Sequence, residues 1–182
     1  LSFGVIMGFA VLYANTEHIA RENAGLFFTV AAAGIVCSRL FAGRIVQKQG
    51  TLCALKVAFL SGIVGFSLLI FARYIHGLFF IAGAFCGLSN GLYQPALNSE
   101  AMFRTPQHRR GAASTTFMLP TEIGFSVSSL LAGLIVTYFN YTICWSMCIV
   151  FNIIALILSY LFFKPGSLPP ASTSRHQGDQ SE

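Results

Sequence analysis

The sequence predicts an all-α membrane protein, a bundle of six transmembrane helices. Two observations support this fold class. Hydrophobic residues make up 55% of the 182 residues and charged residues only 9%, with a mean hydropathy of +0.70, whereas a soluble domain carries roughly 25% charged residues. The apolar residues also gather in six long stretches separated by short polar turns, as helices that cross a bilayer require.

Each predicted span ends at a polar or basic turn. A polar segment at 15–23, basic turns at 43–50 and 103–110, and short connections at 73–76 and 140 separate the apolar stretches. The first stretch would be about 21 Å long as a helix, short of the ~30 Å hydrocarbon core, so we expect a truncated helix there. The spans are expected at about residues 1–14, 24–43, 51–72, 77–102, 111–139 and 141–163.

These spans form one predicted transmembrane domain, residues 1–163. The remaining residues, 164–182, are rich in Pro, Ser and Gly. Such a composition buries too little apolar surface to fold, so we expect a disordered cytoplasmic tail.

The basic residues indicate how the spans are oriented. Of the 11 Lys and Arg residues, Arg21 and Arg73 fall on one side of the membrane and the others on or near the opposite side. The positive-inside rule predicts that the richer side, and with it both chain ends, is cytoplasmic. Basic residues confined to helix ends also argue against nucleic-acid binding. The residues on the richer side are Arg39, Arg44, Lys48, Lys56, Arg104, Arg109, Arg110, Lys164 and Arg175.

Small residues mark faces where helices can pack closely. Gly83, Gly87 and Gly91 are spaced by four in the fourth span, and Gly124 begins a similar stripe of small residues in the fifth. Residues four apart share one helix face, and such stripes let membrane helices approach one another. We expect these glycines to serve helix packing.

Glu122 is the most informative single residue of the chain. Counted from Arg109 and Arg110, it lies about 18 Å into its helix, near the middle of the bilayer. A carboxylate there costs several kcal/mol unless it is paired, hydrated or protonated, so we expect it to face the bundle interior or a water-filled cavity. Two interpretations remain open: Glu122 binds a proton or a cationic group during transport, or it forms a structural hydrogen bond. Pro120 loosens the helix beside it.

Further polar candidates lie in the second and fourth spans. Asn90, Tyr93 and Gln94 follow the glycine stripe, and an amide at this depth needs a partner, so Asn90 is expected to face inward. It is a candidate for an interhelical hydrogen bond or a substrate contact. Arg39 is expected to act as an anchor or gate near the cytoplasmic side, paired with a carboxylate such as Glu100. Arg44, Arg109 and Arg110 are expected to fix topology and contact anionic lipid.

The residue patterns of enzymes and metal sites are not found in the sequence. Its five cysteines lie in apolar surroundings without metal-ligand spacing and are expected to be small core residues. A nucleophile elbow, a P-loop and a dinucleotide fingerprint are missing, and no acids or histidines are paired at one depth. We expect no catalytic residue, no metal and no cofactor.

Two segments resemble a known family of transporters. Residues 24–50, AGLFFTVAAAGIVCSRLFAGRIVQKQG, and residues 109–133, RRGAASTTFMLPTEIGFSVSSLLAG, resemble the second and fifth helices in the C-terminal half of a major facilitator superfamily transporter. The resemblance is nearest to the drug and sugar efflux branch of the family, whose members are proton antiporters. In that family, the loop after the second helix usually carries an Asp at the position of Gln47. This Asp helps to hold the cytoplasmic ends of the two halves together, so the resemblance implies that this contact lacks its acid here.

The resemblance implies that the chain is the C-terminal six-helix half of such a transporter, partnered by a missing N-terminal half in a bacterial inner membrane. It also implies secondary active transport, namely efflux of a small organic solute against protons by alternating access. Two alternatives stay open. The chain is a helical membrane protein without transport, such as an assembly or sensor partner, or a non-functional transporter fragment.

Overall fold

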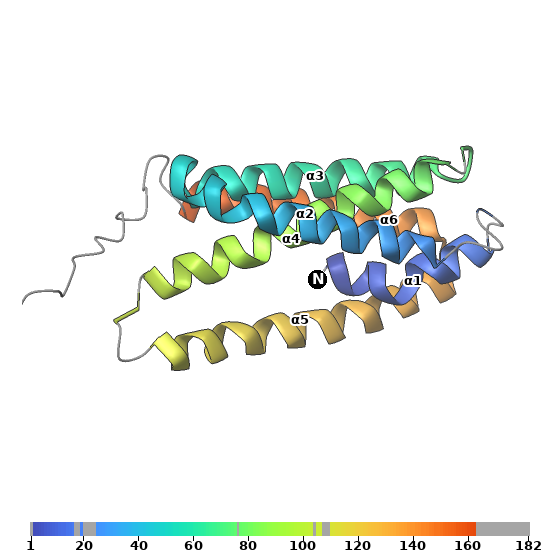
Figure 1. Ribbon diagram of the computed structural model, residues 1–182. Helices are drawn as coiled ribbons and strands as arrows, with labels where there is room; N and C mark the ends of the chain where they lie inside the picture. Colours follow the sequence, from blue (N-terminus) through green and yellow to red (C-terminus); the bar gives the residue numbers. More distant parts are fainter. Residues whose placement is uncertain are drawn as a thin grey trace, which may run out of the picture.

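The described part of the chain folds into six helices that lie roughly side by side (Figure 1). We describe it from a computed structural model, restricted to residues 2–16, 19, 25–75, 77–103, 105–106 and 110–162. Within these residues there is no strand, and the predicted six-helix fold class is confirmed. The helices are α1 (Ser2–Thr16), α2 (Leu26–Gln49), α3 (Thr51–Phe71), α4 (Gly77–Phe103), α5 (Arg110–Tyr138) and α6 (Tyr141–Phe162).

Four of these helices contain an apolar segment long enough to cross a membrane. The segments are Leu26–Val46, Thr51–Phe71, Met118–Tyr138 and Tyr141–Phe162. Within α1, residues Gly4–Thr16 form a shorter apolar helix. Helix α4 is long enough but carries a polar run in its second half, with Asn90, Gln94 and Asn98. The tail predicted at 164–182 lies outside the described residues.

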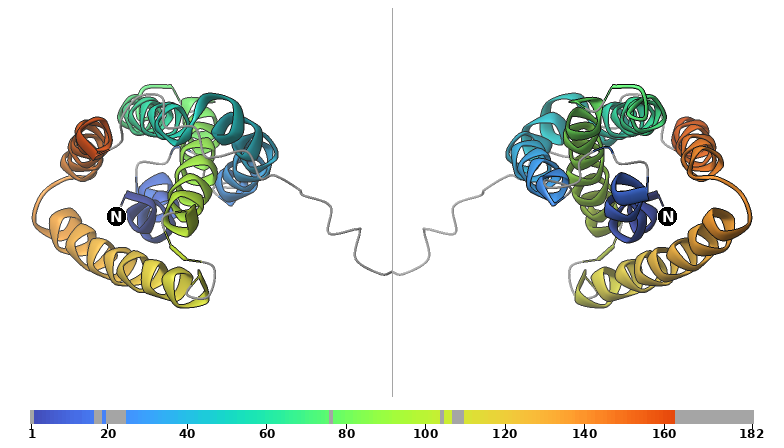
Figure 2. Two further views of the ribbon diagram at one scale, coloured as in Figure 1. Left: turned by 90° about the vertical axis from the view of Figure 1, so that its left-hand side faces the viewer. Right: turned by 90° about the vertical axis from the view of Figure 1, so that its right-hand side faces the viewer.

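Helix α4 lies at the centre of the bundle. It packs along α2 on one side and α3 on the other, α3 packs in turn against α6, and α1 packs against α5. The end-on views show α2 and α5 on either side of the second half of α4 (Figure 2). The centre of the bundle is therefore a single helix that carries both the glycine stripe and the polar run.

The close approach of α2 and α4 depends on the glycines of α4. A Cβ atom added at Gly83 would lie 3.1 Å from the Phe27 carbonyl oxygen, and one added at Gly91 would lie 2.8 Å from the Ile35 carbonyl oxygen. One added at Gly87 would overlap the Ala31 carbonyl oxygen. Backbone therefore packs on backbone over two turns, as small-residue stripes allow.

Helices α1 and α5 meet at a second small-residue contact. A Cβ atom added at Gly4 would lie 2.7 Å from the Phe125 carbonyl oxygen, and one added at Gly8 would lie 3.1 Å from Ser129 Oγ. Gly124 itself is only half-buried. The face of α5 that contains Phe125 and Ser129 therefore points toward α1.

An aromatic cluster joins α1, α3 and α6. The ring centroid of the fully buried Trp145 lies 5.6 Å from that of Tyr13 and 6.1 Å from that of Phe66. The Tyr13 hydroxyl donates a hydrogen bond of 3.1 Å to the backbone carbonyl of Leu69. Packing and this bond together fix α1 against its neighbours.

Replacing Tyr13 by Phe tests this hydrogen bond. We expect the Tyr13→Phe variant to lose about 1 kcal/mol of stability, because the buried Leu69 carbonyl loses its side-chain donor while the ring packing remains. The melting temperature of the purified protein measures this loss. Tyr138→Phe is the matched control, since Tyr138 is 78% exposed; an equal effect of both variants would contradict the prediction.

Candidate functional site

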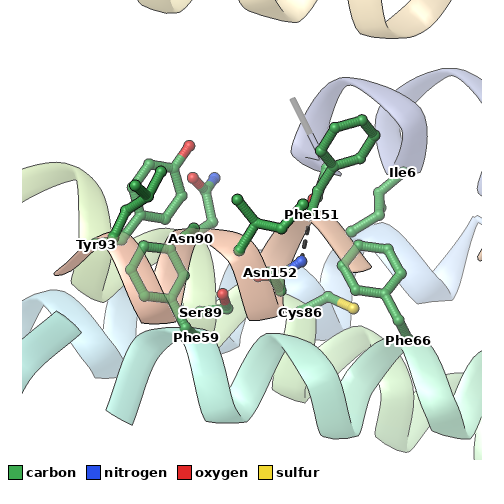
Figure 3. A pocket seen from close by; sticks show the side chains of 13 residues that line it. Ile6, Phe59, Phe66, Cys86, Ser89, Asn90, Tyr93, Phe151 and Asn152 are labelled. Atoms are coloured by element: carbon green, nitrogen blue, oxygen red, sulfur yellow. Dashed lines mark hydrogen bonds between the residues drawn. The ribbon is translucent and has the colours of Figure 1, made fainter. Parts of the chain in front are cut away.

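The polar residues of α4 are divided between cavities on different sides of the helix. Asn90 and Tyr93 line a cavity of about 290 Å³ that α1, α3, α4 and α6 enclose (Figure 3). Gln94, one residue after Tyr93, lines a different cavity of about 500 Å³ between α2, α4 and α5. Successive helical positions differ by about 100° around the axis, which accounts for this separation.

The first cavity is apolar apart from a few side-chain groups. Asn90 is only 7% exposed, and the Tyr93 ring stacks on Phe59 at a centroid distance of 6.4 Å. From the facing helix α6, the Asn152 amide donates to Ser2 Oγ at 3.1 Å and to the Cys148 carbonyl at 2.8 Å. The Asn152 amide on this wall is therefore already bonded to protein partners.

Asn152 is a residue that sequence reasoning missed. It is the one amide side chain in the described helix α6, within an otherwise apolar stretch, and it is buried. A lone amide in a membrane span needs partners. That rule was applied to Asn90 and, applied equally to α6, would have indicated Asn152 as well.

We call the second cavity the α2–α4–α5 cleft. Most of the polar residues that line it belong to α2 and α4. Its lining residues are Arg39, Ala42, Gly43, Gln94, Pro95, Asn98 and Met118. The Arg39 side chain is exposed. Asn98 Oδ1 is buried and accepts no hydrogen bond from the residues that the structure describes. The cleft therefore offers one cation, and the wall beside it contains one buried acceptor without a partner.

Glu122 lies on α5 near this cleft, although it is not one of the lining residues. It follows Met118, a lining residue, by four positions, and residues four apart share one helix face. The Glu122 side chain is exposed. Its backbone is about 6 Å further along the axis of α5 than that of Met118, at 1.5 Å per residue.

Arg39 and Glu100, considered as a pair from the sequence, line different cavities. Glu100 accepts a hydrogen bond of 2.9 Å from Thr51 Oγ1 and lines a cavity of about 470 Å³ between α3, α4 and α6. Arg39 lines the α2–α4–α5 cleft instead. Arg44 is exposed on α2, whereas Arg109 and the side chain of Arg110 lie outside the described residues.

The cysteines differ in burial. Cys86, Cys144 and Cys148 are buried, Cys53 is half-buried, and Cys37 is exposed, contrary to the expectation of a core position. Within the described ranges, no three His, Cys, Asp or Glu side chains come together as a metal site would require.

Apolar helices of membrane length around clefts with isolated polar side chains define an integral, multi-pass membrane protein. The chain belongs to the major facilitator superfamily, whose sequence profile matches residues 1–181. The resemblance noted for residues 24–50 and 109–133 is thereby confirmed. The six helices correspond to one half of that family's fold.

Curated relatives match nearly the whole chain. It is 26% identical over 173 residues to the staphylopine export protein of Staphylococcus aureus, covering 93% of this chain and 43% of that protein. It is also 26% identical over 174 residues to the uncharacterized MFS-type transporter YhhS of Salmonella enteritidis and of Escherichia coli, covering 94% of this chain and 42% of each relative. The chain thus spans less than half the length of these relatives. No solved structure matches it.

Proposed function

We propose that this chain is the C-terminal half of a secondary active transporter that exports a small organic solute in exchange for protons. The observation that carries the proposal is that Arg39 and Glu122, two exposed charged side chains, lie at or beside one cleft within membrane-length helices. The family and the names of the relatives support transport over enzymatic catalysis.

The depth of the two charges supports a hydrated pathway. Arg39 follows the first residue of α2 by 13 positions and Glu122 follows the first residue of α5 by 12. Arg39 lies seven residues before the end of the apolar segment Leu26–Val46, and Glu122 four residues after the start of the apolar segment Met118–Tyr138. At 1.5 Å per residue they are about 10 Å and 6 Å inside a hydrocarbon core about 30 Å thick. Charges at this depth are tolerated where they face water or a partner, which is why they mark transport pathways.

Each group has a proposed role. Glu122 takes up and releases the proton, and Gln94 contacts the solute. Asn90 and Tyr93 belong to the neighbouring cavity, where they are proposed to hold α4 in place or to contact the solute. Alternating access rocks this half against an N-terminal half of six helices, with the cleft at their interface.

The orientation is part of the proposal. From the positive-inside rule we propose that residues 50, 103 and 110 face the cytoplasm of a bacterial cell, with the protein in the inner membrane. Arg44, Arg109 and Arg110 then lie at the level of anionic headgroups, which they contact.

Proton-coupled flux tests the proposal. The full-length transporter is reconstituted in vesicles with an imposed pH gradient, and a trapped pH-sensitive dye reports proton movement when a solute is added. We expect at least one solute from a panel that includes staphylopine to collapse the gradient, and a protonophore to abolish solute accumulation. Flux of no solute under any gradient would favour the non-transporting membrane protein instead.

A further inference from the structure

We infer that the α2–α4–α5 cleft is a binding subsite for an amphoteric solute, one that carries both a carboxylate and a hydrogen-bond donor such as an ammonium group. The inference rests on the proposed transport function and names the substrate class. It is argued from how the cleft forms, from Arg39, from Asn98 and from Glu122.

The cleft forms because α4 first packs against α2 and then, about one turn later, diverges from it. Gly87 and Gly91 hold α4 against the backbone of α2. Pro95 follows inside the same helix, and a proline lacks the N–H that would bond the carbonyl four residues earlier, which kinks the helix. Beyond it, α4 turns away from α2 toward the start of α5 (Figure 1). The residues that line the cleft therefore come from both of the diverging helices.

Arg39 supplies the site for the carboxylate. Its side chain is exposed, lines the cleft and forms no ion pair with any residue in the described part of the chain. A guanidinium group presents its N–H donors as a rigid fork that matches a carboxylate in a bidentate arrangement. An unpaired arginine inside a membrane helix is costly unless water or an anion faces it. An anionic solute group meets that need.

Asn98 supplies the acceptor for the solute's donor. Its Oδ1 atom is buried without a hydrogen-bond partner among the described residues, and a buried unsatisfied acceptor costs about 1–3 kcal/mol. Native proteins rarely leave such groups unpaired. Rotation of this amide toward the cleft lets a solute N–H bond the oxygen and recover that cost, while a solute without a donor does not. Gln94, on the same wall, adds a second amide.

Glu122 makes the two charges of the solute necessary. Glu122 is exposed and follows the lining residue Met118 by one turn of α5, and the inference is that its carboxylate reaches the cleft opposite Arg39 of α2. A purely anionic solute is attracted by Arg39 but repelled by ionised Glu122. A purely cationic solute is attracted by Glu122 but repelled by Arg39. A solute with both charges finds a partner for each.

The test uses three probes that share one body and differ in charge. L-phenylalanine carries a carboxylate and an ammonium group, 3-phenylpropionate only the carboxylate, and phenethylamine only the ammonium group. Binding to the purified full-length transporter is measured by equilibrium dialysis. We expect L-phenylalanine to bind at least about tenfold more tightly than either analogue, because each lost partner leaves a charged or buried group unpaired.

Variants assign the preference to residues. Arg39→Met is expected to weaken L-phenylalanine and 3-phenylpropionate at least about tenfold and to leave phenethylamine unchanged, with Arg39→Lys intermediate. Asn98→Ala is expected to weaken L-phenylalanine and phenethylamine about three- to tenfold and to spare 3-phenylpropionate. Lys48→Met is the matched control, since Lys48 is an exposed cation in the last turn of α2. Gel filtration verifies that each variant is folded.

Three results overturn the inference. The first is that phenethylamine or 3-phenylpropionate binds as well as L-phenylalanine. The second is that none of the three binds. The third is that Arg39→Met leaves the order of affinities unchanged. Failure of the proposed function looks different. The binding order then holds while no solute moves under any gradient, whereas transport with an unchanged KM in Arg39→Met refutes only the subsite.

Discussion

Replacing Gly87 by alanine is expected to lower the stability of the protein by about 3 kcal/mol. The added Cβ atom overlaps the Ala31 carbonyl oxygen, and the Ala31 carbonyl carbon and Cα lie only 2.9 Å and 3.1 Å away. These are backbone atoms of α2 and cannot rotate aside, so α2 and α4 must separate, at the upper end of the usual cost of overpacking. The expected fall in melting temperature is on the order of 10 °C.

Gly77→Ala is the matched control for this variant. Gly77 begins the same helix, and a Cβ atom added there meets no atom within 4 Å. We expect Gly77→Ala to melt within about 1 °C of the parent protein, since surface substitutions change stability little. If Gly87→Ala also melts like the parent, α4 does not pack on α2 in the way described here.

The second large effect is expected for Glu122→Gln, which should abolish proton-driven transport. The amide has the shape of the carboxyl group but cannot take up a proton at physiological pH. Because the side chain is exposed, folding should be unaffected. We expect proton-driven flux to fall at least about 100-fold, which is near total loss, while exchange of solute across the membrane without a gradient continues.

Vesicle assays separate these two modes of movement. Proton-driven flux is measured with an imposed pH gradient, and exchange is measured with the same solute on both sides and no gradient. Ser126→Ala is the control, because Ser126 lies one turn further along α5, is exposed and donates only to the Glu122 backbone carbonyl. If transport by Glu122→Gln is still coupled normally to protons, only the structural interpretation of this acid remains.

The number and order of the helices could be predicted from the sequence, because both depend on local patterns. Apolar stretches of bilayer length and the turns between them are properties of neighbouring residues. The choice of partners is not local. The stripe at Gly83, Gly87 and Gly91 predicted a close approach to some helix, but only the folded chain shows that the partner is α2.

The candidate site was predictable in its residues but not in its grouping. Asn90, Tyr93 and Gln94 lie close together in the sequence and are predicted as one group, yet they line two cavities. Asn98 was not singled out, because nothing in its neighbours reveals that its carbonyl oxygen is buried without a partner. Burial and cavity lining depend on residues far away in the sequence, which is why this part required the structure.

The two prolines give the bundle an uneven stiffness. Pro95 lies 8 residues before the end of α4 and Pro120 lies 10 residues after the start of α5. Each lacks the N–H that would bond the carbonyl four residues earlier, so each helix bends more easily at its proline than elsewhere. On α4 such a bend is restrained on both sides, by the contact of Gly87 with α2 and by the hydrogen bond that Glu100 accepts from Thr51.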